Sequence, residues 1–303
     1  MDYVILESPA NVLKIIYENK KQVQNVKSFN QQNPLKMTTE DHQNQKDQAL
    51  ALLPELKEEL ENLAVGVTDK NLLKFLLWKP DVKRAADRFR AHVKWRRENV
   101  WAFDEPELRV SADAQVDRLI KGEFMVAPDS LASKDGSAVL VGRLRNNDMK
   151  DGRTATDVCR SILYLIDRVL EREEAQLNGV VIFHDLNGIT KNNVDIEIPK
   201  MLLRGIIGHF PIRIKGIYML NPPWFFKGMF SVISKLLFPK KLKARTHYLN
   251  SIDDVYKFID QDKLLAEHGG SLEFDIKVWA QRHREREENG TNESLHNCIP
   301  VKL

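Results

Sequence analysis

The spacing of apolar residues divides this chain into a helical part and a later part in which strands and helices alternate. From Gln45 onward, leucines recur at steps of three and four residues, which is the spacing of one helix face. Thr68 and Asp81 each precede a further run of this kind and are residue types favoured at helix N-caps. The pattern predicts three helices, and we expect a helical domain over residues 45–110.

Unbroken runs of β-branched, aliphatic and aromatic residues in the second part are typical of buried strands. These runs predict strands at residues 138–144, 180–183 and 212–220, and periodic segments predict helices at 112–121, 154–174 and 196–209. Helical connections of this length suit parallel strands. We therefore expect an α/β domain with a largely parallel sheet over residues 111–279.

The two ends of the chain show neither pattern. Residues 1–44, rich in Asn and Gln, are expected to be a disordered leader with Met37 as an alternative start, and residues 280–303 a polar tail. No apolar run reaches the roughly 20 residues that span a bilayer, and we expect no secretory signal. Two cysteines, Cys159 and Cys298, are too few for a disulfide framework or a metal cluster. We expect a reducing, cytoplasmic location, Cys159 in the core, and no metal or cofactor.

One stretch differs from the rest in charge. Residues 198–252 contain no Asp or Glu but ten Lys and Arg residues, although the net charge of the whole chain is only +3. Within this stretch, residues 224–237 predict a helix with a continuous apolar stripe, bounded by prolines. That helix is either an ordinary core element or a segment suited to move as a unit over a ligand.

A basic run at residues 240–245 follows that helix directly. Such a run is commonly just solvated surface, but beside an apolar helix it also fits contact with an anionic bilayer. Nucleic acid is the competing anion. We disfavour it because the run contains no aromatic residue on which bases could stack.

Motifs for catalysis are missing from the sequence. There is no G-x-S-x-G, no P-loop, no G-x-G-x-x-G and no zinc-type spacing. His184 and Asp185 end a predicted strand, but neighbours on a strand point to opposite faces and cannot pair with each other. His184 should share a face with Val180 and Ile182. Its imidazole either forms a hydrogen bond with a backbone carbonyl or acts as a polar anchor in an apolar cavity. We do not expect an enzyme.

Several motifs, in this order, resemble the CRAL-TRIO lipid-binding family, which includes tocopherol- and retinaldehyde-binding proteins, the clavesins and phosphatidylinositol transfer proteins. They lie between about Gln45 and Trp279 and read FLLWKPDVKRAADRF, QLNGVVIFHDLNG, FPIRIKGIYMLNPPWFF, KLKAR and LLAEHGG. The segment YLIDRVLEREEAQLNG also looks like the lipid-binding domain of a non-receptor tyrosine phosphatase.

The resemblance implies an N-terminal helical layer on an α/β domain that encloses one lipid under a mobile gate helix at residues 224–237. The implied pocket is lined by Ile162, Ile166, Val180, Ile182, His184, Leu202, Ile206 and Ile217 and closed by Phe226, Met229, Phe230 and Ile233. The implied phosphoinositide-binding residues are Lys79, Arg213, Lys241 and Arg245, with Lys240 and Lys243 as alternatives for the last two.

Two functions follow from these expectations. The first is a protein that binds one hydrophobic small molecule or phospholipid, of a kind the sequence does not specify, and transfers or presents it at phosphoinositide-containing membranes. The second is a phosphoinositide-binding trafficking adaptor without net lipid transfer. Both place the protein peripherally on endosomal or Golgi membranes, and neither has a nucleic-acid partner.

Overall fold

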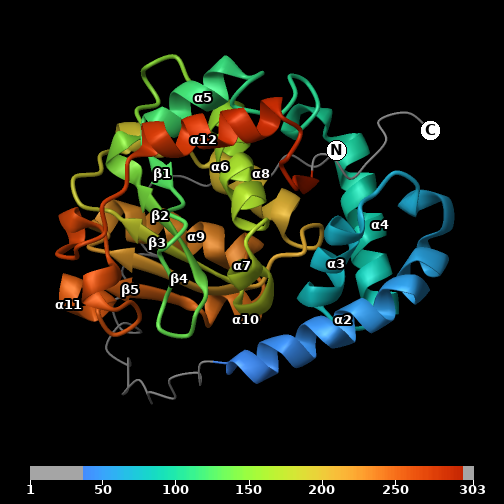
Figure 1. Cartoon of the computed structure of the whole chain (residues 1–303). Coiled ribbons are helices and arrows are strands. Elements are labelled where there is room, and N and C mark those ends of the chain that lie inside the picture. The colour runs from blue at the N-terminus through green and yellow to red at the C-terminus, as the bar shows by residue number, and fades with distance from the viewer. Residues whose placement is uncertain (1–36, 296–303) are drawn as a thin grey trace.

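The computed structural model describes residues 37–295 and shows a layer of helices beside an α/β domain (Figure 1). The helical layer consists of α2 (Thr39–Leu60), α3 (Asp69–Trp78) and α4 (Val82–Glu98). The predicted N-caps are present, because the side chains of Thr68 and Asp81 accept hydrogen bonds from main-chain amides of α3 and α4.

The first helix begins inside the segment that we predicted to be a disordered leader. Thr38 and Asp41 form a capping box, in which each side chain accepts a hydrogen bond from the main-chain amide of the other residue. The leader prediction is therefore wrong from Thr39 onward. Residues 1–36 lie outside the described residues.

Five strands form one sheet in the order β1-β2-β3-β4-β5. They are β1 (Met125–Val126), β2 (Ala138–Arg143), β3 (Val180–Asp185), β4 (Ile214–Leu220) and β5 (Thr246–Leu249). β1 is antiparallel to β2, and the other neighbouring pairs are parallel. The predicted α/β class with a largely parallel sheet is confirmed. β2 is buried along its whole length, which explains its unbroken apolar sequence.

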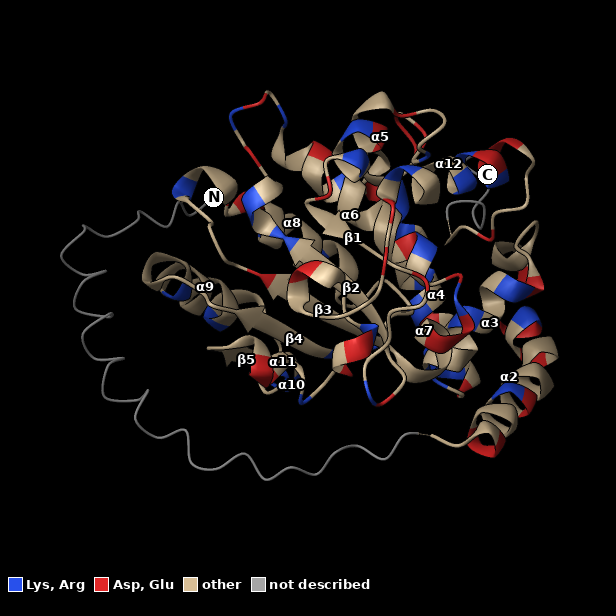
Figure 2. Ribbon diagram, turned by 60° about the vertical axis from the view of Figure 1, so that its left-hand side comes forward, with Lys and Arg blue, Asp and Glu red and all other residues tan. Residues whose placement is uncertain are grey.

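A row of three helices covers one face of this sheet. These helices are α6 (Ala155–Val169), α8 (Glu197–Ile206) and α9 (Trp224–Leu237), with α6 packed on α8 and α8 packed on α9. The remaining α-helices are α5 (Ala114–Lys121), α7 (Glu173–Asn178), α10 (Lys240–Lys243), α11 (Ile252–Val255) and α12 (Ile276–Glu288). In Figure 2, α9 and the helical layer lie at opposite ends of the molecule.

The helix predicted over residues 154–174 is interrupted near its end. α6 ends at Val169, and α7 begins separately at Glu173. The side-chain amide of Gln176 donates to the carbonyl oxygen of Leu170 at 2.8 Å. This bond satisfies a carbonyl at the end of α6 and so stabilises the break between the two helices.

The segment predicted to be a polar tail packs into the fold. α12 continues past position 280, and residues 293–295, which we call the C-terminal strap, are held by buried polar side chains. Asn71 of α3 donates to the carbonyl of Ser294 at 3.2 Å, and Asp167 of α6 accepts from the amide of Leu295 at 2.8 Å. The strap therefore joins the helical layer to the α/β domain.

Among residues 37–295, no helix is long and apolar enough to cross a membrane, and no group of His, Cys, Asp or Glu side chains is arranged to hold a metal ion. Cys159 is buried in α6, and burial raises the pKa of its thiol to about 12. Cys298 lies outside the described residues.

Candidate functional site

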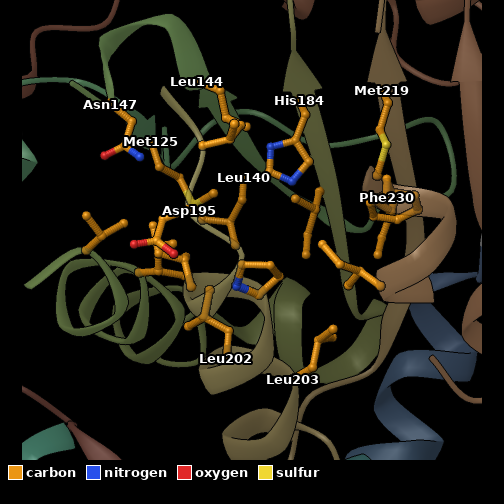
Figure 3. Close-up of a pocket in the computed structure, with 18 of the residues that line it drawn as sticks. Met125, Leu140, Leu144, Asn147, His184, Asp195, Leu202, Leu203, Met219 and Phe230 are labelled. Atoms are coloured by element: carbon orange, nitrogen blue, oxygen red, sulfur yellow. The ribbon is translucent and has the colours of Figure 1, made fainter. Parts of the chain in front are cut away.

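An apolar cavity of about 200 Å³ lies between the sheet and the helix row of α6, α8 and α9 (Figure 3). Its floor is one face of the sheet, because alternate residues of a strand point to the same side. Ile182 and His184 reach the cavity from β3. The parallel register places Leu140 and Ile217 beside Ile182, and Met219 beside His184, and these three also line the cavity.

The structure brings eleven of the twelve predicted pocket residues to this cavity. They are Ile162, Ile166, Ile182, His184, Leu202, Ile206, Ile217, Phe226, Met229, Phe230 and Ile233. The prediction for Val180 is wrong, because Val180 is fully buried in the main core and does not line the cavity. Val180 is the first residue of β3, and the pairing with β4 shifts register between Val180 and Val181, so the simple alternation does not extend to it.

His184 is the polar residue on the cavity floor. Its ring hangs from β3, and Nε2, the nitrogen farther from the backbone, points into the cavity (Figure 3). Nδ1 is buried against Gly142 of β2 and has no hydrogen-bond partner among the described residues. Burial lowers the pKa of the imidazole to about 4, so the ring is neutral near pH 7. The accessible part of the His184 side chain faces the cavity. No carbonyl among the described residues accepts a hydrogen bond from Nδ1.

The helix α9, over the predicted residues 224–237, forms the roof of the cavity. Phe226 and Ile233 are buried beneath it, and both line the cavity. The other side of the helix faces solvent, where Trp224 is 77% exposed and Leu236 is 75% exposed. The solvent side of α9 thus carries large apolar side chains beside Lys227 and Lys235, whereas an ordinary core-facing helix presents mainly polar residues to water.

Three polar residues of the lining lie outside the α-helices and strands and were missed by the sequence analysis. The side-chain amide of Asn147 donates to the carbonyl of Asn193 at 3.0 Å, and that of Asn193 donates to the carbonyl of Asn147 at 3.2 Å. Asp195 lies just before α8 and accepts from the amide of Glu197 at 2.8 Å. Connecting segments between α-helices and strands follow no hydrophobic period, so no signal in the sequence places these residues at the cavity.

Beyond α9 lies a basic surface, which we define as Lys240, Lys241, Lys243 and Arg245. All four side chains are exposed. Two of them bind main-chain oxygens: Lys243 Nζ donates to the carbonyl of Lys235 at 3.3 Å, and Arg245 Nη1 donates to that of Ile214 at 2.7 Å. Further lysines lie along α9 (Figure 2). The positive charge of this region therefore faces solvent, and the segment contains no acidic residue that could pair with it.

Arg213, predicted as a headgroup-binding residue, has a structural role. Its Nη2 donates to the carbonyl of Gln176 at 2.5 Å and also to that of Leu177, both near the end of α7. A cation is favoured at a helix C-terminus, and burial lowers the pKa of this guanidinium. Arg245 lies near Arg213, because its guanidinium donates to the carbonyl of Ile214, the residue after Arg213. Lys79 is exposed at the end of α3, on the helical layer.

Comparison with known proteins agrees with the fold. A family model described as the CRAL/TRIO domain matches residues 132–270, which lie inside the predicted α/β domain. Mouse Clavesin-2 is 28% identical over 220 residues, which cover 70% of this chain and 65% of that protein. Human Clavesin-2 is 28% identical over 196 residues, covering 63% of this chain and 58% of that protein.

A second kind of relative matches this chain over a smaller share of its own length. Mouse tyrosine-protein phosphatase non-receptor type 9 is 25% identical over 208 residues, which are 68% of this chain but 34% of that protein. The matches thus span less than two thirds of the length of these curated relatives.

Among solved structures, the crystal structure of Sfh5 has a similar fold. It superposes with a TM-score of 0.50 at 11% sequence identity and covers 84% of this chain and 100% of that chain. At this identity the likeness concerns the fold alone.

Proposed function

We propose that this protein, whose residues 132–270 match the family model described as the CRAL/TRIO domain, binds one hydrophobic lipid in its cavity and transfers or presents it at phosphoinositide-containing membranes. One observation carries the proposal. α9 covers the apolar cavity with one side and presents Trp224 and Leu236 to solvent on the other, next to the basic surface. The same helix can therefore meet the ligand and a bilayer.

Ligand binding follows from the apolar lining. Each Å² of apolar surface removed from water contributes about 25 cal/mol before ordering costs are subtracted. Release needs a path, and the roof is the natural one, because α9 is bounded by Pro223 and Pro239 and its main helical neighbour is α8. A bilayer that takes up Trp224 and Leu236 would favour conformations in which α9 has moved away from the cavity.

The basic surface supplies attraction to anionic lipids. A Lys or Arg near an anionic bilayer contributes about 1 kcal/mol, and added salt weakens the attraction. Lys241, Arg245 and Lys79 are the exposed candidates for contact with a phosphatidylinositol bisphosphate. Arg213 would have to leave the carbonyls of α7 to take part.

A transfer assay tests the proposal. Donor liposomes carry a fluorescent lipid, and acceptor liposomes either contain or lack a phosphatidylinositol bisphosphate. We expect the protein to accelerate transfer, and more strongly with the phosphoinositide in the acceptor. Liposome binding without movement of lipid would contradict transfer and would instead support a membrane adaptor.

Reversal of charge on the basic surface should separate membrane contact from ligand binding. We expect Lys241→Glu combined with Arg245→Glu to weaken binding to phosphoinositide liposomes at least about tenfold, measured by co-sedimentation, because two attractive charges become repulsive. Neither residue lines the cavity, so bound lipid should remain.

The matched control for that variant is Lys94→Glu combined with Arg97→Glu. Both residues are exposed on α4 in the helical layer, so the control changes net charge equally at another place. Equal loss of liposome binding in both variants would show that net charge, and not the basic surface, drives the contact.

A further inference from the structure

The charges around the cavity restrict what its ligand can be. Among the described residues that line it there is no Lys and no Arg, and the lining's carboxylate is that of Asp195. A phosphate or carboxylate group inside the cavity would thus meet no counter-ion and one like charge. Burial of an unpaired ionised group is strongly unfavourable, so an anionic headgroup does not fit inside.

The cavity nevertheless holds one polar group that is free to receive a ligand. Nε2 of His184 points into it from the floor (Figure 3), and Nδ1 of the same ring is buried without a partner among the described residues. The surrounding strand residues Leu140, Ile182 and Ile217 are apolar. A ligand with one polar group would place that group at His184 to avoid leaving it unpaired.

The other neutral polar side chains of the lining are already occupied. The carbonyl oxygen of the Asn147 side chain accepts from Arg153 at 3.0 Å, and its amide donates to the main chain of Asn193. The side-chain oxygen of Asn193 accepts from both the amide and the hydroxyl of Thr190, at 2.7 and 2.9 Å. These two residues brace the loops, which leaves His184 as the site for a hydrogen bond to the ligand.

We infer that the ligand is an uncharged lipid alcohol whose hydroxyl group forms a hydrogen bond with Nε2 of His184. This inference rests on the proposed function and deepens it. A hydroxyl both donates and accepts, so it suits either neutral tautomer of the imidazole. Burial, which keeps the ring neutral, agrees with this choice.

The size of the cavity points to a compact or single-chain molecule. Its volume is about 200 Å³, below the roughly 300–1,000 Å³ of pockets that enclose drug-sized ligands. A phospholipid with two acyl chains would require α9 to be displaced while the ligand is bound.

Competition against a neutral dye tests the inference. The full chain is stripped of lipid and loaded with Nile red, which is then displaced by oleyl alcohol, by oleyl phosphate or by octadecene, whose chains match in length. We expect oleyl alcohol to displace the dye at concentrations about tenfold lower than either of the others, the value of one net hydrogen bond.

Substitution of the anchor should remove this preference. In His184→Phe we expect oleyl alcohol and octadecene to compete within about twofold of each other, because the hydrogen bond worth about tenfold is gone. The control His247→Phe makes the same exchange on the opposite face of the sheet, since His247 is paired with Tyr218 rather than with a lining residue. In this control, oleyl alcohol should still displace the dye at lower concentrations than octadecene, as in the wild-type protein.

Circular dichroism shows whether His184→Phe folds. If it does not fold, a second variant still tests the inference. Asp195→Asn retains the side-chain oxygen that accepts from Glu197 and removes the like charge. We expect it to narrow the gap between alcohol and phosphate by about threefold and to leave the gap between alcohol and hydrocarbon unchanged.

The outcomes distinguish this inference from the function on which it rests. If Nile red binds and oleyl phosphate or octadecene competes as well as oleyl alcohol, the lipid-alcohol inference is overturned while lipid binding stands. If neither the dye nor any of the three competitors binds, the proposed function fails and the inference fails with it.

Discussion

At the scale of single residues, Gly142 sets the position of His184. A Cβ atom at Gly142 would lie 2.4 Å from Nδ1 of His184, closer than any real contact of this kind. We expect Gly142→Ala to push the ring out of place, to lower the free energy of unfolding by about 1–3 kcal/mol, and to weaken the preference for lipid alcohols. Urea unfolding and dye competition measure the two effects.

The control for this change is Gly228→Ala in α9. A Cβ atom there meets nothing within 4 Å, and in a helix Ala is more favourable than Gly by roughly 0.5–1 kcal/mol. The control should leave stability equal or slightly higher. An unfolding midpoint of Gly142→Ala that matches wild type would show that the ring moves aside without cost.

The sequence predicts individual side chains well where a simple period governs them. Alternation along β3 predicts that His184 and Asp185 face opposite sides, and the structure agrees: Asp185 binds Arg145 rather than facing the cavity. Alternation fails for Val180, where the register with β4 shifts. The contact of Arg213 with α7 could not be predicted, because it depends on where the tertiary fold places the end of that helix.

At the scale of elements, α9 is the helix that should contact the bilayer. We expect Trp224→Ala and Leu236→Ala each to weaken liposome binding about tenfold, because burial of one large apolar side chain is worth about 1.5–3 kcal/mol. Ligand binding should persist, since both residues face solvent. Co-sedimentation and retained lipid are the measurements.

Val278→Ala serves as the matched control for these substitutions. Val278 is 66% exposed, but on α12. Liposome binding should not change in this variant. Wild-type binding by Trp224→Ala would show that α9 does not enter the bilayer.

Elements differ in how far their sequence specifies them. The bounds of α9 could be predicted, because prolines flank a continuous apolar stripe. The break between α6 and α7 could not, because both segments continue one helical pattern. That break is stabilised by the amide of Gln176 on the Leu170 carbonyl, a contact made only after the chain has turned.

At the scale of the whole molecule, buried histidines predict sensitivity to acid. Burial lowers the pKa of His92 to about 3, of His184 to about 4 and of His283 to about 2. An unfolded histidine titrates near 6.5, so below that pH the unfolded chain binds more protons than the folded one. We expect the free energy of unfolding to fall from about pH 6.5 to pH 4.5, before most carboxylates titrate.

Urea unfolding at a series of pH values measures this slope. His283→Phe, which keeps an aromatic ring against Trp279, removes one of the three groups and should make the slope shallower. A free energy of unfolding that stays constant from pH 7 to pH 5 would mean that these histidines are protonated as easily in the folded protein as in the unfolded chain.

The overall architecture was more predictable than the contacts that hold its parts together. Alternating helices and strands predict the α/β class, and a buried parallel sheet follows from unbroken apolar runs. The C-terminal strap gave no such signal. Its anchors Asn71 and Asp167 are polar residues in helices, at distances of 223 and 128 positions along the chain, and no periodic pattern links positions so far apart.

The position of the C-terminal strap in the sequence determines when during synthesis its hydrogen bonds can form. Asp167 leaves the ribosome 128 residues before Leu295, which supplies its main-chain partner. At typical elongation rates this interval is on the order of ten seconds. Throughout it, the carboxylate of Asp167 lacks the main-chain amide that it binds in the finished fold, although its side-chain partner Arg168 is the next residue. The hydrogen bonds that join α3 and α6 to the strap can therefore form only after nearly all of the described chain has been synthesised.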